Sequence, residues 1–280
     1  MTRTWLITGA SRGFGRALAA AALEAGDQVV ATARRPEQLG DLVAEHPDRA
    51  RAVALDVTDP AAAVAAVERA VAEFGALDVV VNNAGYATSA PIEEMSDADF
   101  RAQVEANLFG VVNVTRAALP VLRRQRSGTF VQFSSVGGRA GGTPGMGAYQ
   151  TAKFAVEGFS EVLANEVAPF GVRVVIVEPG AFRTDWQGSS MVRHETGPHY
   201  EETVGAINRF RDETDGVQPG DPARGARVVL DVVASDDPPR RLVLGAAAVE
   251  HVLAAEAKRS AETREWAAVS ASADFPSGQS

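Results

Sequence analysis

A glycine-rich turn that joins an apolar run to a helix constrains the fold of this chain more than any other feature. Residues 5–8 (WLIT) are mostly apolar and lead into the turn 9–15 (GASRGFG), and a second apolar run occupies residues 29–33. Between Phe14 and Ala22, apolar side chains recur at four-residue spacing, which is typical of one face of a helix. The segment therefore predicts a strand, a tight turn, a helix and a second strand, the repeating unit of a parallel α/β sheet.

The three glycines of this turn have separate physical roles. Gly9 permits the tight turn, and Gly13 and Gly15 let the backbone and the helix N-terminus approach a diphosphate group. The alternative is a flexible connection that binds nothing. Because a helix and a second strand follow the turn directly, we interpret it as a dinucleotide-binding turn.

Further apolar runs and amphipathic segments continue the alternation of strands and helices. We expect strands at residues 52–56, 77–81, 129–134, 172–177 and 241–245, and helices at residues 61–74, 97–124, 149–169, 221–234 and 246–268. Strands that alternate with helices favour right-handed crossovers within a parallel sheet. We therefore predict an α/β fold: a Rossmann-like, doubly wound, seven-stranded parallel sheet flanked by helices on both faces.

The sequence contains neither an internal repeat nor a linker that would mark a second domain, so we expect one domain over residues 1–268. Residues 185–216 lack a regular pattern, and we expect a mobile substrate loop there, because long loops at the carboxyl edge of a parallel sheet bind substrates. The alternative is a surface excursion with a small core of its own. Residues 269–280 are mostly small or polar, and we expect them to be disordered.

The composition argues against several classes of protein. At 280 residues and 46% hydrophobic, the chain can bury a substantial core, and its net charge of −9 disfavours nucleic acid as a main partner. The absence of cysteine excludes disulfides, thiol nucleophiles and cysteine-ligated zinc, and it fits a reducing cytoplasm. We expect no signal peptide, membrane span or metal site, since no apolar run approaches about 18 residues and the four histidines do not converge.

Tyr149 and Lys153 are the first candidates for chemistry. Residues four apart on a helix share a face, so the phenol and the ammonium can point at the same spot. A positive charge about 4 Å away, at an effective dielectric of about 20, favours the phenolate by roughly 4 kcal/mol and predicts a phenol pKa of roughly 7–8. Such a phenol can exchange a proton with an alcohol or a carbonyl. Taken alone, the pair has another interpretation: a surface tyrosine packed over a lysine stem.

Further motifs accompany this pair in a fixed order. They are TGxxxGxG at 8–15, NNAG at 82–85, Asn107 on the next helix, and Pro179-Gly180 with Thr184 four residues on. Over roughly residues 3–245, the ordered set resembles the short single-domain branch of the short-chain dehydrogenase/reductase superfamily. The resemblance implies an enzyme that transfers hydride between a nicotinamide dinucleotide and a carbonyl or secondary alcohol. The alternative is a regulator or sensor that binds NADP without turnover, and such proteins usually lack the Tyr/Lys pair.

The resemblance implies four catalytic residues. Tyr149 transfers the proton, Lys153 lowers the pKa of this tyrosine and holds the nicotinamide ribose, and Asn107 supports a water that leads to bulk solvent. Ser135, which precedes a Val-Gly-Gly turn, matches the serine that hydrogen-bonds the substrate oxygen. The spacing from this serine to the tyrosine is one residue longer than the family usually has, so Ser134 stays a second candidate.

The end of the second strand indicates which cofactor binds. NAD sites usually carry an acidic residue there, whereas this strand ends in Arg34 and Arg35, whose guanidinium groups suit a 2′-phosphate. We therefore expect NADP(H) in preference to NAD(H), with Arg12 as a further cation; the alternative is a solvated arginine pair before Pro36. By resemblance, the cofactor-binding residues are Gly9, Ser11, Arg12, Gly13, Phe14, Gly15, Arg34, Arg35, Asp56, Val57, Asn83, Ala84, Gly85, Tyr149, Lys153, Pro179, Gly180, Phe182 and Thr184.

The resemblance also extends to substrate and assembly. The residues around Ser135 and Tyr149 look nearest to relatives that act on steroids, retinoids and other lipophilic ketones or alcohols. We therefore expect a lipophilic small-molecule substrate, and a lid at 185–216 that supplies an apolar wall of its pocket. Because the helix after Tyr149 forms a dimer face in related proteins, we expect a homodimer or homotetramer.

Overall fold

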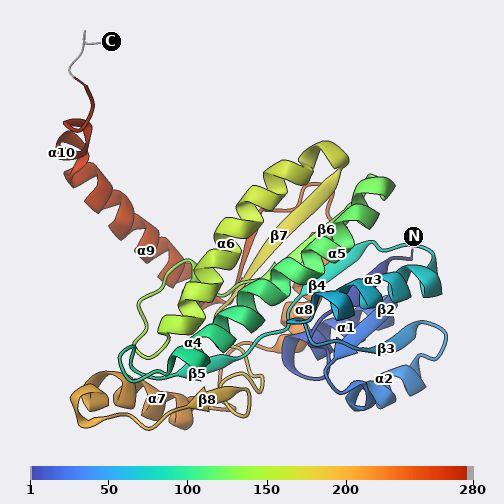
Figure 1. Ribbon diagram of the computed structural model, residues 1–280, viewed down its shortest axis with the longest axis horizontal. Coiled ribbons are helices and arrows are strands. Elements are labelled where there is room, and N and C mark those ends of the chain that lie inside the picture. Colours follow the sequence, from blue (N-terminus) through green and yellow to red (C-terminus); the bar gives the residue numbers. More distant parts are fainter. Residues whose placement is uncertain (1, 276–280) are drawn as a thin grey trace.

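The computed structural model describes residues 2–275 and contains a seven-stranded sheet in which all strands are parallel (Figure 1). The strand order is β3-β2-β1-β4-β6-β7-β9, so the chain builds the sheet outward from β1 to one edge and then to the other. The strands are β1 (Thr4–Ile7), β2 (Gln28–Ala33), β3 (Ala50–Ala54), β4 (Val79–Asn82), β6 (Gly128–Phe133), β7 (Val172–Pro179) and β9 (Arg241–Leu244). The doubly wound sheet predicted from the sequence is confirmed.

Helices cover both faces of the sheet, because successive residues of each strand point to opposite sides. In β1, the buried side chains of Trp5 and Ile7 belong to the core on one face, and Leu6 belongs to the core on the other. The helices of the first face are α1 (Gly13–Glu24), α2 (Gly40–Glu45) and α8 (Pro222–Ala234). The helices of the second face are α3 (Pro60–Phe74), α5 (Gly110–Gln125) and α6 (Gly147–Val167).

The single long helix predicted at residues 97–124 is wrong in one respect. The structure has α4 (Asp97–Val104), then a π-helical turn at Glu105–Phe109, and only then α5. Turns of this kind occur mostly within α-helices and often at functional sites. This one contains Asn107, so the interruption falls on a predicted catalytic residue.

Residues 185–216 are not irregular, which corrects the prediction of a structureless loop. β8 (Met191–Arg193) pairs in parallel with β5 (Ala87–Ser89), and α7 (Ala206–Thr214) follows a π-helical turn at Glu201–Gly205. In Figure 1, β8 and α7 lie beside β5, at the end of the molecule where α4 begins. A three-residue strand and a nine-residue, charge-rich helix are too short to show a clear apolar period, so the sequence pattern missed them.

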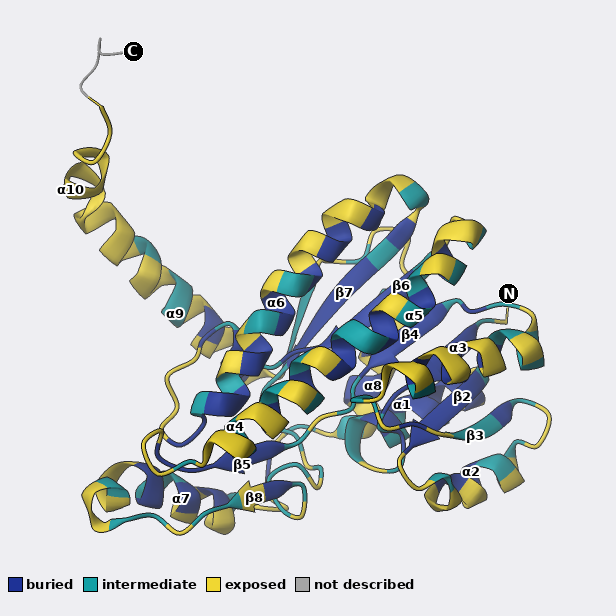
Figure 2. Ribbon diagram, in the orientation of Figure 1, coloured by how far each residue is buried: buried dark blue, intermediate teal, exposed yellow. Residues whose placement is uncertain are grey.

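The C-terminal helices extend away from the sheet. α9 (Ala246–Glu265) follows β9 and continues into α10 (Ala267–Ala271), and Figures 1 and 2 show both helices projecting from the body with mostly exposed residues. α10 thus overlaps the start of the segment for which the sequence predicts disorder, and residues 276–280 of that segment lie outside the described residues. Among residues 2–275, no helix is both long enough and apolar enough to cross a membrane.

Candidate active site

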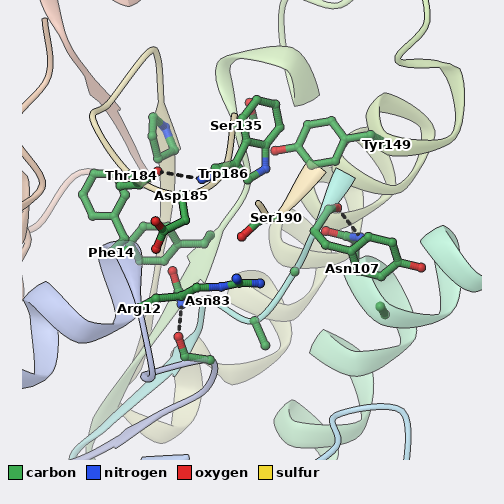
Figure 3. Close-up of a pocket in the computed structure, with 18 of the residues that line it drawn as sticks. Arg12, Phe14, Asn83, Asn107, Ser135, Tyr149, Thr184, Asp185, Trp186 and Ser190 are labelled. Carbon is green, nitrogen blue, oxygen red and sulfur yellow. Dashed lines mark hydrogen bonds between the residues drawn. The ribbon is translucent and has the colours of Figure 1, made fainter. Parts of the chain in front are cut away.

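The carboxyl ends of the parallel strands border one large cavity of about 940 Å³. Its walls are the turns after β1, β2, β3, β4, β6 and β7, together with parts of α6 and of the segment 184–190. Every residue to which the sequence analysis gave a site role lines this cavity, with the exception of Gly15. In Figure 3, Arg12 and Asn83 lie on one side, and Ser135, Tyr149 and Trp186 on the other. Ligands of doubly wound sheets bind at this edge.

Glycine is required at the turn for two different reasons. Gly9 and Gly13 have φ angles of +65° and +56°, in the region that glycine adopts most easily. A Cβ at Gly15, by contrast, would lie 2.3 Å from the Gly9 carbonyl oxygen and 2.5 Å from Asn83 Nδ2. The lack of a side chain at Gly15 therefore serves the packing of α1 on the turn, and its role beside a diphosphate stays a prediction.

The N-terminus of α1 faces the cavity without a capping side chain. Arg12 is the N-cap residue, its side chain makes no capping hydrogen bond, and the first turn of the helix contains no acidic residue. Arg12, Gly13 and Phe14 all line the cavity. The free backbone N–H groups at a helix N-terminus attract anions, so this end of the cavity fits a diphosphate.

The NNAG loop is tied to the end of β1 by hydrogen bonds. Thr8 Oγ1 accepts hydrogen bonds from the backbone N–H groups of Asn83 and Ala84, both at 3.0 Å. Asn83 Nδ2 donates to the carbonyl oxygens of Thr8 at 2.9 Å and Gly9 at 3.2 Å. The Asn83 amide nitrogen therefore holds two loops in register, which shapes the cavity and stabilises the sheet edge.

The end of the cavity beside β2 is positively charged. Arg34 and Arg35 are exposed and line the cavity, and within residues 2–275 neither forms an ion pair. Asp56 Oδ1 accepts hydrogen bonds from the Thr58 N–H at 3.0 Å and its hydroxyl at 2.8 Å. These bonds, aided by the charge of Arg34, hold the pKa of Asp56 below its ordinary value.

Arg12 donates from Nη1 to Ser189 Oγ at 3.3 Å, so its guanidinium lies against the segment after β7.

Tyr149 and Lys153 share one face of α6, as their spacing predicts. Their exposed fractions are 6% and 5%, and both line the cavity. Lys153 Nζ lies 5.8 Å from the centroid of the Tyr149 ring and donates a hydrogen bond of 2.7 Å to the Phe133 carbonyl oxygen. The Tyr149 hydroxyl points toward Ser135 and Trp186 in Figure 3, and the Trp186 ring lies 5.3 Å from the phenol ring.

The pKa of roughly 7–8 predicted for Tyr149 is wrong for this structure. Burial raises the pKa of Tyr149 to about 12, and a hydrogen bond with Ser135 opposes this rise only in part. Burial also lowers the pKa of Lys153 to about 8, against the opposing charge of Glu157. Helical spacing predicts the neighbouring charge but not the desolvation, which is the larger effect at this site.

The geometry favours Ser135 over Ser134 as the substrate-binding serine. Ser135 Oγ accepts a hydrogen bond of 3.0 Å from the Gly137 N–H, which leaves its own O–H to be donated into the cavity. Ser134 also lines the cavity, but its hydroxyl acts on Glu157, whose pKa it lowers. The additional residue in the loop before Tyr149 therefore leaves Ser135 beside the phenol.

Asn107 is fully buried and held by its amide nitrogen. Nδ2 donates to the carbonyl oxygens of Tyr86 and Gln103, both at 3.0 Å. A Cβ at Gly85 would lie 2.5 Å from Asn107 Oδ1 and 3.8 Å from Lys153 Nζ, so these two polar groups lie on the same side of Gly85. Within residues 2–275, no group donates a hydrogen bond to Oδ1. Buried polar atoms normally have a hydrogen-bond partner, so this oxygen has a free acceptor position. A free acceptor fits a role of Asn107 in binding or proton transfer.

The segment after β7 closes the cavity over the glycine turn. Pro179, Gly180, Phe182 and Thr184 line the cavity as predicted. The Phe182 ring packs 4.7 Å from the ring of Phe14, and the Gly180 N–H donates to the Leu244 carbonyl oxygen at 2.9 Å. These contacts fix the segment against α1 and β9.

Several residues that line the cavity had no role predicted from the sequence, and Tyr86, Gln187 and Arg211 are among them. Tyr86 directly follows the NNAG motif, and this position was a signal for it. Gln187 and Arg211 lie in the segment 185–216, which has no detectable period. Arg211 reaches the cavity only because α7 packs beside β5.

Comparison with known proteins identifies close relatives. Residues 3–194 match the family described as short chain dehydrogenase. The chain is 50% identical over 267 residues to the oxidoreductase BOA17 of Botryotinia fuckeliana (strain B05.10). This alignment covers 95% of this chain and 97% of that protein. It is 35% identical over 244 residues to a 3-ketodihydrosphingosine reductase of Bacteroides thetaiotaomicron, with coverage of 86% and 87%.

Solved structures share the fold. A short-chain dehydrogenase from Streptomyces avermitilis has a TM-score of 0.91 and 44% identity, over 98% of this chain and 100% of that one. Two less similar structures contain a nicotinamide cofactor. One is a 3-ketoacyl-(acyl-carrier-protein) reductase from Brucella melitensis complexed with NADH (TM-score 0.73, 27% identity, coverage 86% and 96%). The other is a short chain dehydrogenase from Burkholderia cenocepacia J2315 in complex with NADP (TM-score 0.74, 26% identity, coverage 94% and 97%).

Proposed function

Because the chain belongs to the short-chain dehydrogenase family, we propose that it transfers hydride between NADP(H) and the carbonyl or secondary alcohol carbon of a lipophilic small molecule. Its relatives are named oxidoreductases and reductases, and the chain is an oxidoreductase of this family. The observation that carries the proposal is the convergence of Tyr149, Ser135 and Lys153 on the cavity that the glycine turn also lines.

Each side chain of the site has its own role in carbonyl reduction. The Ser135 hydroxyl donates a hydrogen bond to the substrate oxygen, and the Tyr149 phenol gives its proton to the same oxygen. The bound nicotinamide supplies the hydride. With a pKa of about 12, the phenol carries its proton at neutral pH, and it gives that proton up only as the substrate oxygen becomes an alkoxide, a much stronger base. The Lys153 ammonium then stabilises the phenolate that remains, and Asn107 Oδ1 supports the path that returns a proton.

The charge at the adenosine end supports NADP(H) as the cofactor. The two residues directly after β2 are Arg34 and Arg35 rather than a carboxylate, and both stand exposed at the cavity with no ion-pair partner among the described residues. A guanidinium can bind a 2′-phosphate with two parallel hydrogen bonds, whereas a ribose hydroxyl gains much less from it. The solved relatives contain NADH in one case and NADP in another, and both fit a nicotinamide site.

The apolar side of the cavity supports a lipophilic substrate. Ala87, Met146, Tyr149 and Met191 form a buried cluster, and Trp186 packs against it. One of the relatives is named a 3-ketodihydrosphingosine reductase. A sensor without turnover has no need for Tyr149, Lys153 and Ser135 in one cavity, so this alternative is the weaker one.

A homodimer or homotetramer is also part of the proposal. Phe154 and Val162 on α6 are 44% and 57% exposed, so this helix presents two large apolar side chains to solvent. Burial of this face against a second copy would remove both from water. Size-exclusion chromatography with light scattering tests it, and a strictly monomeric protein would refute it.

Replacing Tyr149 tests the catalytic proposal. Tyr149→Phe should lower kcat for NADPH-dependent carbonyl reduction by about 10²- to 10⁴-fold, because the proton donor is lost while the ring remains. The NADPH dissociation constant should change by less than about threefold. Tyr200→Phe, in the segment that packs beside β5, is the matched control and should keep full activity. Wild-type turnover by Tyr149→Phe would show that the phenol is not the proton donor.

A further inference from the structure

α7 buries two of its polar side chains. Its buried residues are Asn208 and Arg211, whereas Phe210 is 59% exposed. Figure 2 shows this buried part of α7 between exposed turns. A helix that packs only for stability buries its apolar stripe, and burying a guanidinium costs free energy unless other groups compensate. The burial of Arg211 beside the cavity therefore indicates a role for its charge there.

Arg211 has neutral hydrogen-bond partners but no counter-ion. Its Nη1 donates to Ser89 Oγ at 3.2 Å and to Asn208 Oδ1 at 3.1 Å. Within residues 2–275, no carboxylate lies within ion-pair distance of the guanidinium, and no protein group accepts a hydrogen bond from Nε or Nη2. Burial, together with the like charge of Arg193, lowers the pKa of Arg211 to about 10. The site thus favours an added negative charge.

The position of Arg211 places this charge on the substrate side of the cavity. Arg211 lines the same cavity as Tyr149. Its partner Ser89 ends β5, and Ala87 at the start of that short strand packs in the apolar cluster with Tyr149 and beside Trp186. The cofactor end, at Arg34, is built from the turns after β2 and β3 instead.

We propose that Arg211 binds a carboxylate of the substrate, so that the enzyme prefers lipophilic carbonyl compounds or alcohols that carry an acidic group. This inference rests on the proposed function and narrows its substrate class. Nη1 is held by Ser89 and Asn208, which leaves the edge formed by Nε and Nη2. That edge carries two parallel donors, the arrangement that binds both oxygens of a carboxylate. The apolar wall at Trp186 would cover the chain between the carboxylate and the reacting carbon.

The experiment compares acids with their uncharged esters. The probes are 4-oxopentanoate, 6-oxoheptanoate and 9-oxodecanoate, each measured beside its methyl ester with NADPH. For at least one chain length, wild-type kcat/KM should be about tenfold or more higher for the acid, mostly through KM, because a charged hydrogen-bonded pair forms only with the acid. Arg211→Met should abolish this preference and change ester turnover by less than about twofold. Arg211→Lys should restore part of the preference.

Matched controls separate binding from a structural role of Arg211. Arg209 lies on the exposed side of α7 and pairs with Glu201, so Arg209→Met should keep the acid preference. If Arg211 merely ties α7 to β5, Arg211→Met will lower acid and ester turnover equally, and the proposal is overturned. Equal kcat/KM for acid and ester in the wild type at every chain length would also overturn it.

A binding measurement keeps the inference testable if a variant does not fold or if no probe is reduced. Calorimetry on the wild-type protein with NADPH should show octanoate binding at least about tenfold more tightly than octanamide. Equal affinity overturns the role of Arg211. Absence of carbonyl reduction across the whole panel, with either cofactor, overturns the proposed function instead.

Discussion

The protonation of Lys153 provides the sharpest test of the site. Lowering its pKa from 10.5 to about 8 corresponds to about 3 kcal/mol against the buried ammonium, at about 1.4 kcal/mol per pKa unit. The chain has only one other lysine, Lys258, on the exposed α9. In cofactor-free protein labelled with ¹³C at lysine Cε, two signals should therefore be seen. The one lost in Lys153→Met should titrate near pH 8, and the one lost in Lys258→Met is the reference.

The same pKa has a consequence for stability. The unfolded chain holds the Lys153 proton up to about pH 10.5 and the folded protein only up to about pH 8, so the unfolded state binds more protons between these values. Stability should therefore rise with pH in this window, by up to about 3 kcal/mol from this residue. Urea unfolding of wild type and Lys153→Met between pH 7 and pH 10 measures the difference. A constant difference between the two proteins, or a Lys153 signal that titrates above pH 10, would refute the reasoning.

Two further substitutions test the cofactor end of the cavity. Arg34→Asp should lower the ratio of kcat/KM for NADPH over NADH by at least about tenfold, since it replaces the proposed phosphate-binding cation by a carboxylate. Arg124→Asp, at an exposed position of α5, is the control, and an unchanged ratio in Arg34→Asp would refute the proposed role of Arg34. Gly9→Ala should destabilise the protein by about 1–3 kcal/mol and weaken NADPH binding, because φ is +65° and the new Cβ would lie 2.9 Å from backbone. Gly26→Ala has the same kind of strain but open space around it, so it should lose stability in urea unfolding without losing NADPH affinity.

The sheet and the glycine turn were predictable because their signals are local. Trp5, Leu6 and Ile7 are all buried, since β1 is covered on both faces, and such a strand appears in the sequence as an unbroken apolar run. The positive φ of Gly9 follows from the tight turn that must join this strand to α1. The order of the motifs also predicted that Ser135 and Tyr149 lie at one cavity, because parallel strands present their carboxyl ends at the same edge of the sheet.

The features that the sequence did not predict depend on contacts between distant segments. The pKa of Tyr149 is set by burial under Trp186 and its neighbours, which helical spacing does not contain. The π-helical turn at Asn107 interrupts what is otherwise a continuous helical pattern. Arg211 enters the cavity only through the pairing of β8 with β5 and the polar contact to Ser89. Each of these features becomes visible only in the tertiary structure.

The choice between lysine and arginine at each position follows from burial and from the donors that each side chain offers. The chain has 27 lysines and arginines, of which only Lys153 and Lys258 are lysines, so arginine supplies nearly all positive charge. At Arg34 and Arg211, where we propose that a fixed charge binds an anion, arginine is the fitting residue because its guanidinium stays protonated and offers parallel donors. At Lys153 the requirement is different. An ammonium can approach the Phe133 carbonyl as a compact point charge, and burial brings its pKa to about 8, close enough to neutral pH for it to exchange protons. An arginine at 153 would keep the charge but would not exchange its proton near neutral pH, so a lysine fits the proposed site better than an arginine does.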